Sequence, residues 1–212
     1  MSAGGVAHSL DVLRQFAGRR RAVESCELCG LELAGDHPHL VEPKTRKLVC
    51  SCNACAILFG GQSGAKYKRV PGRIRYLADF RLSGAQWESL MIPINMAFLF
   101  ESSAAAKVVA LYPSPAGAAE SQLPLDTWSE ILAENPALAD MGTDVEALLV
   151  NRLGPARGYP EDEYYLLPID ECYKLVWLIR KHWHGLSGGP ELWQQLEAYF
   201  SGLKMRAGAW HA

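Results

Sequence analysis

Two pairs of cysteines, each with two residues between its members, dominate the N-terminal third of this chain. The first pair is Cys26 and Cys29, and the second is Cys52 and Cys55. The tight turn within such a pair points two thiolates at one ion, and two pairs together supply the four ligands of a tetrahedral site. The spacing therefore predicts one metal site with four cysteine ligands.

The segment between the two pairs is expected to fold back on itself. Two short runs of β-forming residues, 37–41 and 47–50, flank a polar turn. Antiparallel pairing of Leu40 with Val49 brings the ends of this hairpin together, which is the geometry that a shared ion requires. We therefore predict a zinc-ribbon-like β-hairpin module over residues 23–59.

The same register places three further candidate ligands near the cysteines. His37, His39 and Cys50 share a face of the hairpin with Cys52, because alternate residues of a strand point to the same side. One tetrahedral ion needs four ligands. The three extra residues are therefore additional or replacement ligands, groups that orient the ligands by hydrogen bonds, or part of a second, exchangeable or redox-active site.

The clustering of the cysteines favours a metal over disulfides, and the residues around the second pair favour zinc over iron. Five of the six cysteines lie within thirty residues, whereas a disulfide framework spreads its cysteines along the chain. Sulfur-rich tetrahedral sites also hold iron, alone or in iron–sulfur clusters. The first pair resembles a rubredoxin knuckle, but the second lacks the matching proline and glycine. Zinc is the expected cofactor, with iron or an iron–sulfur cluster as the alternative.

The rest of the chain predicts an α+β fold, in which the cysteine module is joined to a mixed or antiparallel sheet with helices packed on it. The expected strands come in adjacent pairs, which argues against a doubly wound nucleotide-binding sheet. The expected segments are an N-terminal helix (1–22), the cysteine module (23–59), a basic connecting segment (60–76) and an α+β domain (77–212). Within that domain the expected strands are 90–100, 107–112, 145–150 and 164–168, and the expected helices are 126–134, 170–184 and 190–206.

The connecting segment carries five cations between aromatic residues. Cations interleaved with aromatic side chains are compatible with phosphate contacts and base stacking in a nucleic acid, or with an acidic protein partner. The whole chain has a formal net charge of −2, which argues against a protein built around nucleic-acid binding. The candidate contact residues are Lys66, Lys68, Arg69, Arg73 and Arg75.

Other functional classes find little support in the sequence. The longest apolar run, 90–100, is too short to span a membrane, and the first residues lack the apolar core of a secretory signal. A cytoplasmic protein is therefore expected. The segment 113–121 is not a phosphate-binding loop and is expected to be a plain surface turn. No catalytic triad is recognisable, so a non-enzymatic role is favoured and enzymatic activity is left open.

Four short strings carry a resemblance to a known protein family. They are Cys26-Glu-Leu-Cys-Gly, His37-Pro-His-Leu-Val, Leu48-Val-Cys-Ser-Cys-Asn-Ala-Cys and Leu111-Tyr-Pro-Ser-Pro-Ala-Gly. The chain resembles an uncharacterised bacterial family whose members are often encoded beside uptake nickel–iron hydrogenase genes. The likeness extends from about residue 10 to residue 200. It implies an accessory or assembly role for a hydrogenase, including the handling of iron or an iron–sulfur precursor, with hydrogenase subunits or maturation factors as partners. His37, His39 and Cys50 would then be the residues that handle the metal.

Three functional hypotheses follow. The first is a metal-binding accessory protein with a mainly structural zinc site that docks a protein partner. The second is an electron-transfer or iron-delivery protein that holds iron at the same cysteines. The third is a metal-supported nucleic-acid-binding protein or nuclease that uses the basic segment.

Overall fold

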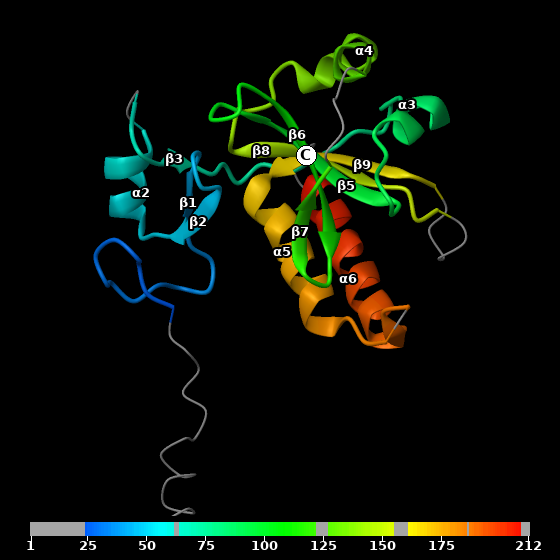
Figure 1. The fold of residues 1–212 in the computed structure, drawn as a ribbon. Helices are drawn as coiled ribbons and strands as arrows, with labels where there is room; N and C mark the ends of the chain where they lie inside the picture. The colour runs from blue at the N-terminus through cyan, green and yellow to red at the C-terminus, as the bar shows by residue number, and fades with distance from the viewer. Residues whose placement is uncertain (1–23, 62–63, 122–126, 155–160, 186, 209–212) are drawn as a thin grey trace, which may run out of the picture.

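The protein has an α+β fold built on two antiparallel sheets, one of three strands and one of six (Figure 1). The structure is a computed structural model and describes residues 24–61, 64–121, 127–154, 161–185 and 187–208. The expected N-terminal helix lies outside these residues. The expected α+β class is confirmed, and every strand pair of the larger sheet is antiparallel.

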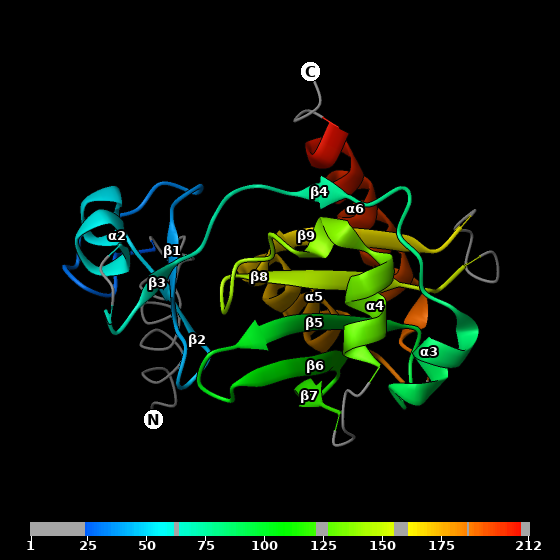
Figure 2. The same ribbon diagram turned by 90° about the horizontal axis from the view of Figure 1, so that it is seen from above.

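The large sheet forms the middle of three layers. Helices α5 and α6 cover one face and α3 and α4 lie over the other (Figure 2). Among the described residues, no helix is both long enough and apolar enough to cross a membrane. In spatial order the strands are β4 (Arg75–Tyr76), β9 (Glu163–Pro168), β8 (Glu146–Asn151), β5 (Met96–Ser102), β6 (Lys107–Ser114) and β7 (Gly117–Glu120). The helices are α3 (Gly84–Ser89), α4 (Trp128–Glu134), α5 (Ile169–His182) and α6 (Gly189–Gly208), with a short 3₁₀ turn at Pro136–Leu138.

The central strands are apolar on both faces because helices cover both sides of the sheet. Phe98 and Phe100 of β5 pack into the core that includes α5 and α6, whereas Ala97 and Leu99 pack into the core beneath α3 and α4. This alternation follows from the two-residue period of a strand. Burial on both faces explains why these strands appear in the sequence as continuous apolar runs.

The small sheet holds the cysteines. It consists of β2 (Lys47–Cys50), β1 (His39–Glu42) and β3 (Lys68–Arg69), with helix α2 (Asn53–Gly60) packed against it. The predicted hairpin register is confirmed: Leu40 pairs with Val49, and His39 pairs with Cys50.

The basic segment contributes one strand to each sheet. Strand β3 pairs with β1, and β4 pairs with β9 at the edge of the large sheet. Val41 of β1 and Val70, directly after β3, belong to the same buried cluster as the core under α5 and α6. The small sheet is therefore packed against the large one as well as connected to it.

The expected strand 90–100 is wrong in its first half. Ser83 and Gln86 form a capping box that starts α3, and Leu90 ends this helix. Met91 then has a positive φ of 50°, which breaks any extended run. Only Met96 onward joins the sheet.

The expected surface turn at 113–121 is also wrong. Pro113 and Ser114 are the last residues of β6, and Gly117 to Glu120 form the edge strand β7. The two strands are joined by a two-residue turn, Pro115-Ala116. Gly117, the first residue after this turn, has a φ of 128°, a conformation that favours glycine. Helix α4 begins at Trp128, and the expected helix start at 126 lies outside the described residues.

Substitution of Gly60 by alanine is expected to destabilise the small sheet. A β-carbon at this position would lie 2.7 Å from Leu40 Cδ2 and 2.9 Å from Arg69 Cβ, so the buried Leu40 side chain and the backbone at Arg69 must move. Overpacking of this kind costs about 1–3 kcal/mol. We expect Gly60→Ala to release bound metal to a chromogenic chelator at lower urea concentration than the native chain does.

The neighbouring glycine supplies the control. A β-carbon on Gly61 would meet only the carbonyl oxygen of Ile57, at an ordinary 3.6 Å. Gly61→Ala should therefore behave like the native chain, and equal behaviour of the two variants would show that the contact of α2 with the sheet is not tight.

Glu171 joins the two long helices through a buried carboxylate. Arg206 of α6 donates to both of its oxygens at 2.9 Å, and Lys174 donates to Oε1 at 2.8 Å. Burial alone raises the pKa of Glu171, but the hydrogen bonds from Arg206 and Lys174 outweigh it and leave the pKa below its ordinary value. The ionised form of Glu171 therefore stabilises the fold.

Glu171→Gln is expected to lower the free energy of unfolding at neutral pH by about 1–3 kcal/mol, a range reduced because both cations are half exposed. The native advantage should be complete above the carboxyl pKa of the unfolded chain, about 4.3. It should shrink as the pH falls through the lower pKa of the folded state. Urea unfolding of both chains across this range measures the effect. The exposed Glu197→Gln should change little at any pH, and a constant difference between native chain and Glu171→Gln would contradict the account.

Candidate metal centre

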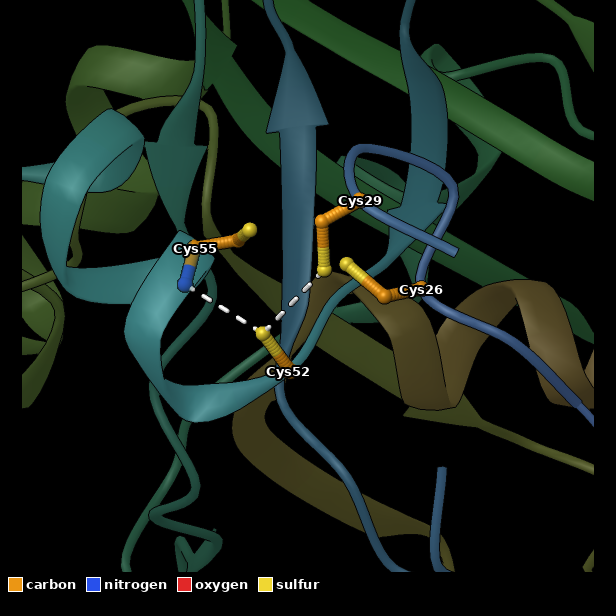
Figure 3. Close-up of side chains that lie close together, drawn as sticks. All are labelled: Cys26, Cys29, Cys52 and Cys55. Carbon is orange, nitrogen blue, oxygen red and sulfur yellow. Dashed lines mark hydrogen bonds between the residues drawn. The ribbon is translucent and has the colours of Figure 1, made fainter. Parts of the chain in front are cut away.

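Four cysteine side chains converge at one end of the small sheet (Figure 3). The sulfurs of Cys26, Cys29, Cys52 and Cys55 all lie within 4.8 Å of one another. The sulfurs of Cys29 and Cys52 are 3.8 Å apart, which equals the edge of a tetrahedron with sulfurs at about 2.3 Å from a central zinc ion. All six cysteines are free thiols. The predicted grouping of the four cysteines is thus present in the structure.

The first pair lies on a tight loop that is closed by backbone hydrogen bonds. The N–H of Cys26 donates to the carbonyl of Leu31, and the N–H of Gly30 donates to the carbonyl of Cys26, both at 2.8 Å. Gly30 has a φ of 77°, the left-handed conformation that glycine adopts without strain. This turn points both sulfurs of the pair inward.

Glu27 attaches this loop to the end of β2. Its N–H donates to the carbonyl of Cys50, and its carboxylate accepts from the N–H of Cys50 and from Lys47 Nζ, each at 2.9 Å. The hydrogen bonds from Lys47 and from the Cys50 backbone lower the pKa of Glu27, so the carboxylate stays charged. The loop is therefore held at a fixed position on the hairpin.

The second pair is positioned by helix α2, which was not expected from the sequence. Cys52 is the N-cap of this helix, and its sulfur accepts a hydrogen bond from the N–H of Cys55 at 3.5 Å. Cys55 lies on the first turn, so the helix start directs both sulfurs to the same point as the first pair. The missed signal is Asn53, a residue type favoured at helix starts, directly before the uninterrupted apolar run 54–59.

The environment of the sulfurs favours thiolate formation at one position in particular. Burial raises the pKa of Cys26, but N–H groups of Cys52, Leu28 and Cys29 point at its sulfur and lower the pKa to about 6. Burial, together with hydrogen bonds to the neighbouring thiols, raises the pKa of Cys55 to about 12. Cys26 is thus the thiolate already present at neutral pH, and a bound cation would draw the protons from the others.

The geometry fits a single ion better than a cluster. An iron–sulfur cluster places several metal and sulfide atoms between its cysteine ligands and holds their sulfurs well apart, whereas here all four lie within 4.8 Å. Cys26, Cys52 and Cys55 are buried and Cys29 is exposed. Four thiolates around one ion leave no position open for a substrate, which is typical of a structural site.

The other three candidate ligands form a separate group. His37, His39 and Cys50 each offer a ligand atom within 4.8 Å of the other two. Cys52, which the hairpin register places on their face, lies with the other cysteines because the chain leaves β2 at Cys50 and turns into α2. The seven candidates therefore divide into a set of four and a set of three.

The basic residues of the connecting segment mostly contact carboxylates of the protein itself. Lys68 pairs with the buried Asp144 at 2.7 Å, Lys66 lies 3.6 Å from Glu42, and Arg73 lies 4.0 Å from Glu146. Arg69 is exposed, and Arg75 is part of β4. The five cations are divided between the two sheets and do not form one group.

Comparison with known proteins identifies the family of this chain. The model of a family of unknown function, DUF5947, matches residues 25–207. The chain belongs to this family. The match begins one residue before Cys26 and ends within α6, so it covers both the four cysteines and the strands of the large sheet. No curated protein and no solved structure matches the chain.

Proposed function

We propose that this protein is a metal-binding accessory protein in which a zinc ion, held by Cys26, Cys29, Cys52 and Cys55, has a structural role. The observation that carries the proposal is the convergence of four sulfurs at distances that suit one tetrahedral ion. The ion would connect the loop of the first pair to the start of α2. Both lie on a sheet whose own core is small, with Leu40, Val49 and Ala56 as its buried residues.

The accessory role is supported by an exposed apolar surface on α2. Ile57, Leu58 and Phe59 are consecutive residues with 65%, 61% and 46% of their surface exposed, one turn beyond the cysteine pair. Exposed apolar residues that lie together indicate a contact with another protein. The proposed partner therefore presents a complementary apolar face to α2. The family resemblance suggests a nickel–iron hydrogenase subunit or maturation factor as the partner to test.

Capture of the partner tests this role. The tagged chain is produced at native levels in its own host, and co-purifying proteins are identified in the native chain and in Leu58→Lys. We expect a hydrogenase subunit or maturation factor with the native chain and at least a tenfold loss with Leu58→Lys. Met205→Lys, which changes an equally exposed apolar residue on α6, is the control and should retain the partner. Recovery of no such protein, or equal recovery with Leu58→Lys, would contradict the role.

The visible spectrum separates zinc from iron at the same thiolates. A single ferric ion with four cysteine ligands is also compatible with the sulfur distances. Zinc protein is colourless, because its filled d shell gives no visible transitions, whereas ferric thiolate absorbs strongly. We expect the chain to stay colourless after brief oxidation in air and to contain one zinc ion. A protein that becomes coloured on oxidation and contains one iron per chain would instead support electron transfer or iron delivery at these cysteines.

A further inference from the structure

His37, His39 and Cys50 come together at the open end of the hairpin, where β1 begins and β2 ends. His39 is the first residue of β1 and Cys50 is the last residue of β2, and the two form a cross-strand pair. His37 lies two residues before His39, and the two imidazole rings are 4.9 Å apart between centroids. One ligand atom from each of the three residues lies within 4.8 Å of the others.

Both imidazoles are oriented in the manner of metal ligands. Nδ1 of His37 donates to the carbonyl oxygen of Ala34 at 2.9 Å, and Nδ1 of His39 donates to Oδ2 of Asp170 at 2.9 Å. Histidines that bind metals commonly donate one ring N–H to a carbonyl or carboxylate and present the other nitrogen to the ion. Here Nε2 of each ring is the nitrogen left for an ion.

The Nε2 atom of His37 has no hydrogen-bond partner among the described residues, which indicates that a ligand binds at this group of three residues. The His37 side chain is only 6% exposed, and its Nε2 is buried. A buried acceptor without a partner costs about 1–3 kcal/mol, so such atoms are rare in native proteins. A cation beside Nε2 would satisfy the lone pair and remove this cost.

We propose that Nε2 of His37, Nε2 of His39 and the sulfur of Cys50 form a second metal site, distinct from the four-cysteine site. Two imidazoles and one thiolate are a donor set for borderline divalent ions such as Zn²⁺. When the ion binds, it displaces the proton of the Cys50 thiol, which passes to solvent.

The second site has an open coordination position. Three protein ligands leave the fourth position of a tetrahedral ion to water or to a donor from another molecule. Two of the three proposed ligands, His37 and His39, line a cavity of about 550 Å³ together with Asp170, Lys174 and Arg206. The ion at this site is therefore exchangeable, unlike the ion enclosed by the four cysteines.

The site also connects the small sheet to helix α5. His39 belongs to the small sheet, whereas Asp170 lies in the first turn of α5, 131 residues later. The Asp170 carboxylate is 13% exposed and its other oxygen accepts from the N–H of Glu171. Asp170 thus acts as a positioning residue that fixes the His39 ring between the small sheet and α5.

Metal titration of the full chain tests the proposal. The metal-free chain, prepared under reducing conditions, is titrated with Co²⁺, and Zn²⁺ is then used for competition with a chelator. We expect two equivalents per chain. The first should give the intense sulfur-to-cobalt absorption of four thiolates, and the second a much smaller increment from one thiolate. The chelator should remove the second equivalent while the first remains.

Variants assign the second equivalent to its ligands. His37→Gln, His39→Gln and Cys50→Ser should each bind one equivalent, and the circular dichroism of each should stay that of the native chain. His184→Gln, at an exposed histidine outside the group, should bind two. Asp170→Ala keeps all three ligands and should weaken the second equivalent by about 10–100-fold, whereas a merely structural contact with His39 would leave its affinity unchanged.

The two proposals fail separately. A native chain that binds one equivalent with the four-thiolate spectrum overturns the second site alone. A second metal equivalent that persists in His37→Gln, His39→Gln and Cys50→Ser would also overturn the second site alone. Absence of the four-thiolate spectrum would overturn the proposed function, whatever the second equivalent does.

Discussion

Cys26→Ser is expected to abolish metal binding at the four-cysteine site and to unfold the small sheet. The apparent free energy of zinc binding at structural sites is about 10–16 kcal/mol, and in small modules this energy is folding energy. Protein segments this small rarely hold together on their core alone. The small sheet's own buried cluster is Leu40, Val49 and Ala56, and two further valines, Val41 and Val70, pack into the core that it shares with the large sheet. Hydrogen exchange should show loss of protection in β1 and β2, while β5 and β8 of the large sheet stay protected.

A neighbouring cysteine provides the control for this variant. Cys50→Ser removes a thiol that lies outside the set of four, so it should retain the first metal equivalent and the protection of β1. Unchanged melting and unchanged amide protection in Cys26→Ser, with no metal bound, would contradict a structural role for the ion.

Phe98→Ala is expected to destabilise the large sheet and to leave the metal at the four cysteines, the reverse of the effect of Cys26→Ser. Phe98 lies in the central strand of the large sheet, is fully buried, and makes an edge-on contact with Tyr173 of α5 at 5.8 Å between ring centroids. Truncation of a buried phenylalanine costs about 3–5 kcal/mol. For a chain of this size that corresponds to a fall in melting temperature of roughly 6–20 °C. Calorimetry measures the fall, and metal analysis at 20 °C should still find the four-cysteine site occupied.

Phe59→Ala is the matched control. Phe59 lies on α2 and is 46% exposed, so its truncation should change the free energy of unfolding by less than about 0.5 kcal/mol. If Phe98→Ala also released the ion from the four cysteines, the small sheet would depend on the large sheet for its stability. The account that the ion is what stabilises the small sheet would then be contradicted.

The parts of this protein that local rules determine could be predicted from the sequence. The two-residue spacing of Cys26 and Cys29, and of Cys52 and Cys55, already implies the four-sulfur group. The two apolar pairs, Leu40-Val41 and Leu48-Val49, flank a polar turn and predict which residues pair, and the observed pairing of Leu40 with Val49 agrees.

Short elements were missed because their stability comes from tertiary contacts. Helices α2 and α3 have only eight and six residues, too few for a clear helical period. The capping box of Ser83 and Gln86 was a usable signal for α3. Strand β7 consists of small residues with low strand propensity and exists because β6 pairs with it.

The division of the seven candidate ligands could not be predicted. It depends on the turn between β2 and α2, which moves Cys52 away from His39 and Cys50. The contact of His39 with Asp170 joins residues 131 positions apart, and no local pattern in one sequence specifies such a pair.

X-ray absorption of the purified chain, after a wash with mild chelator, tests the central claim most directly. The account predicts one zinc ion per chain with four sulfur neighbours at about 2.3 Å. A washed chain that holds no metal, or a metal surrounded mainly by nitrogen and oxygen, would contradict it.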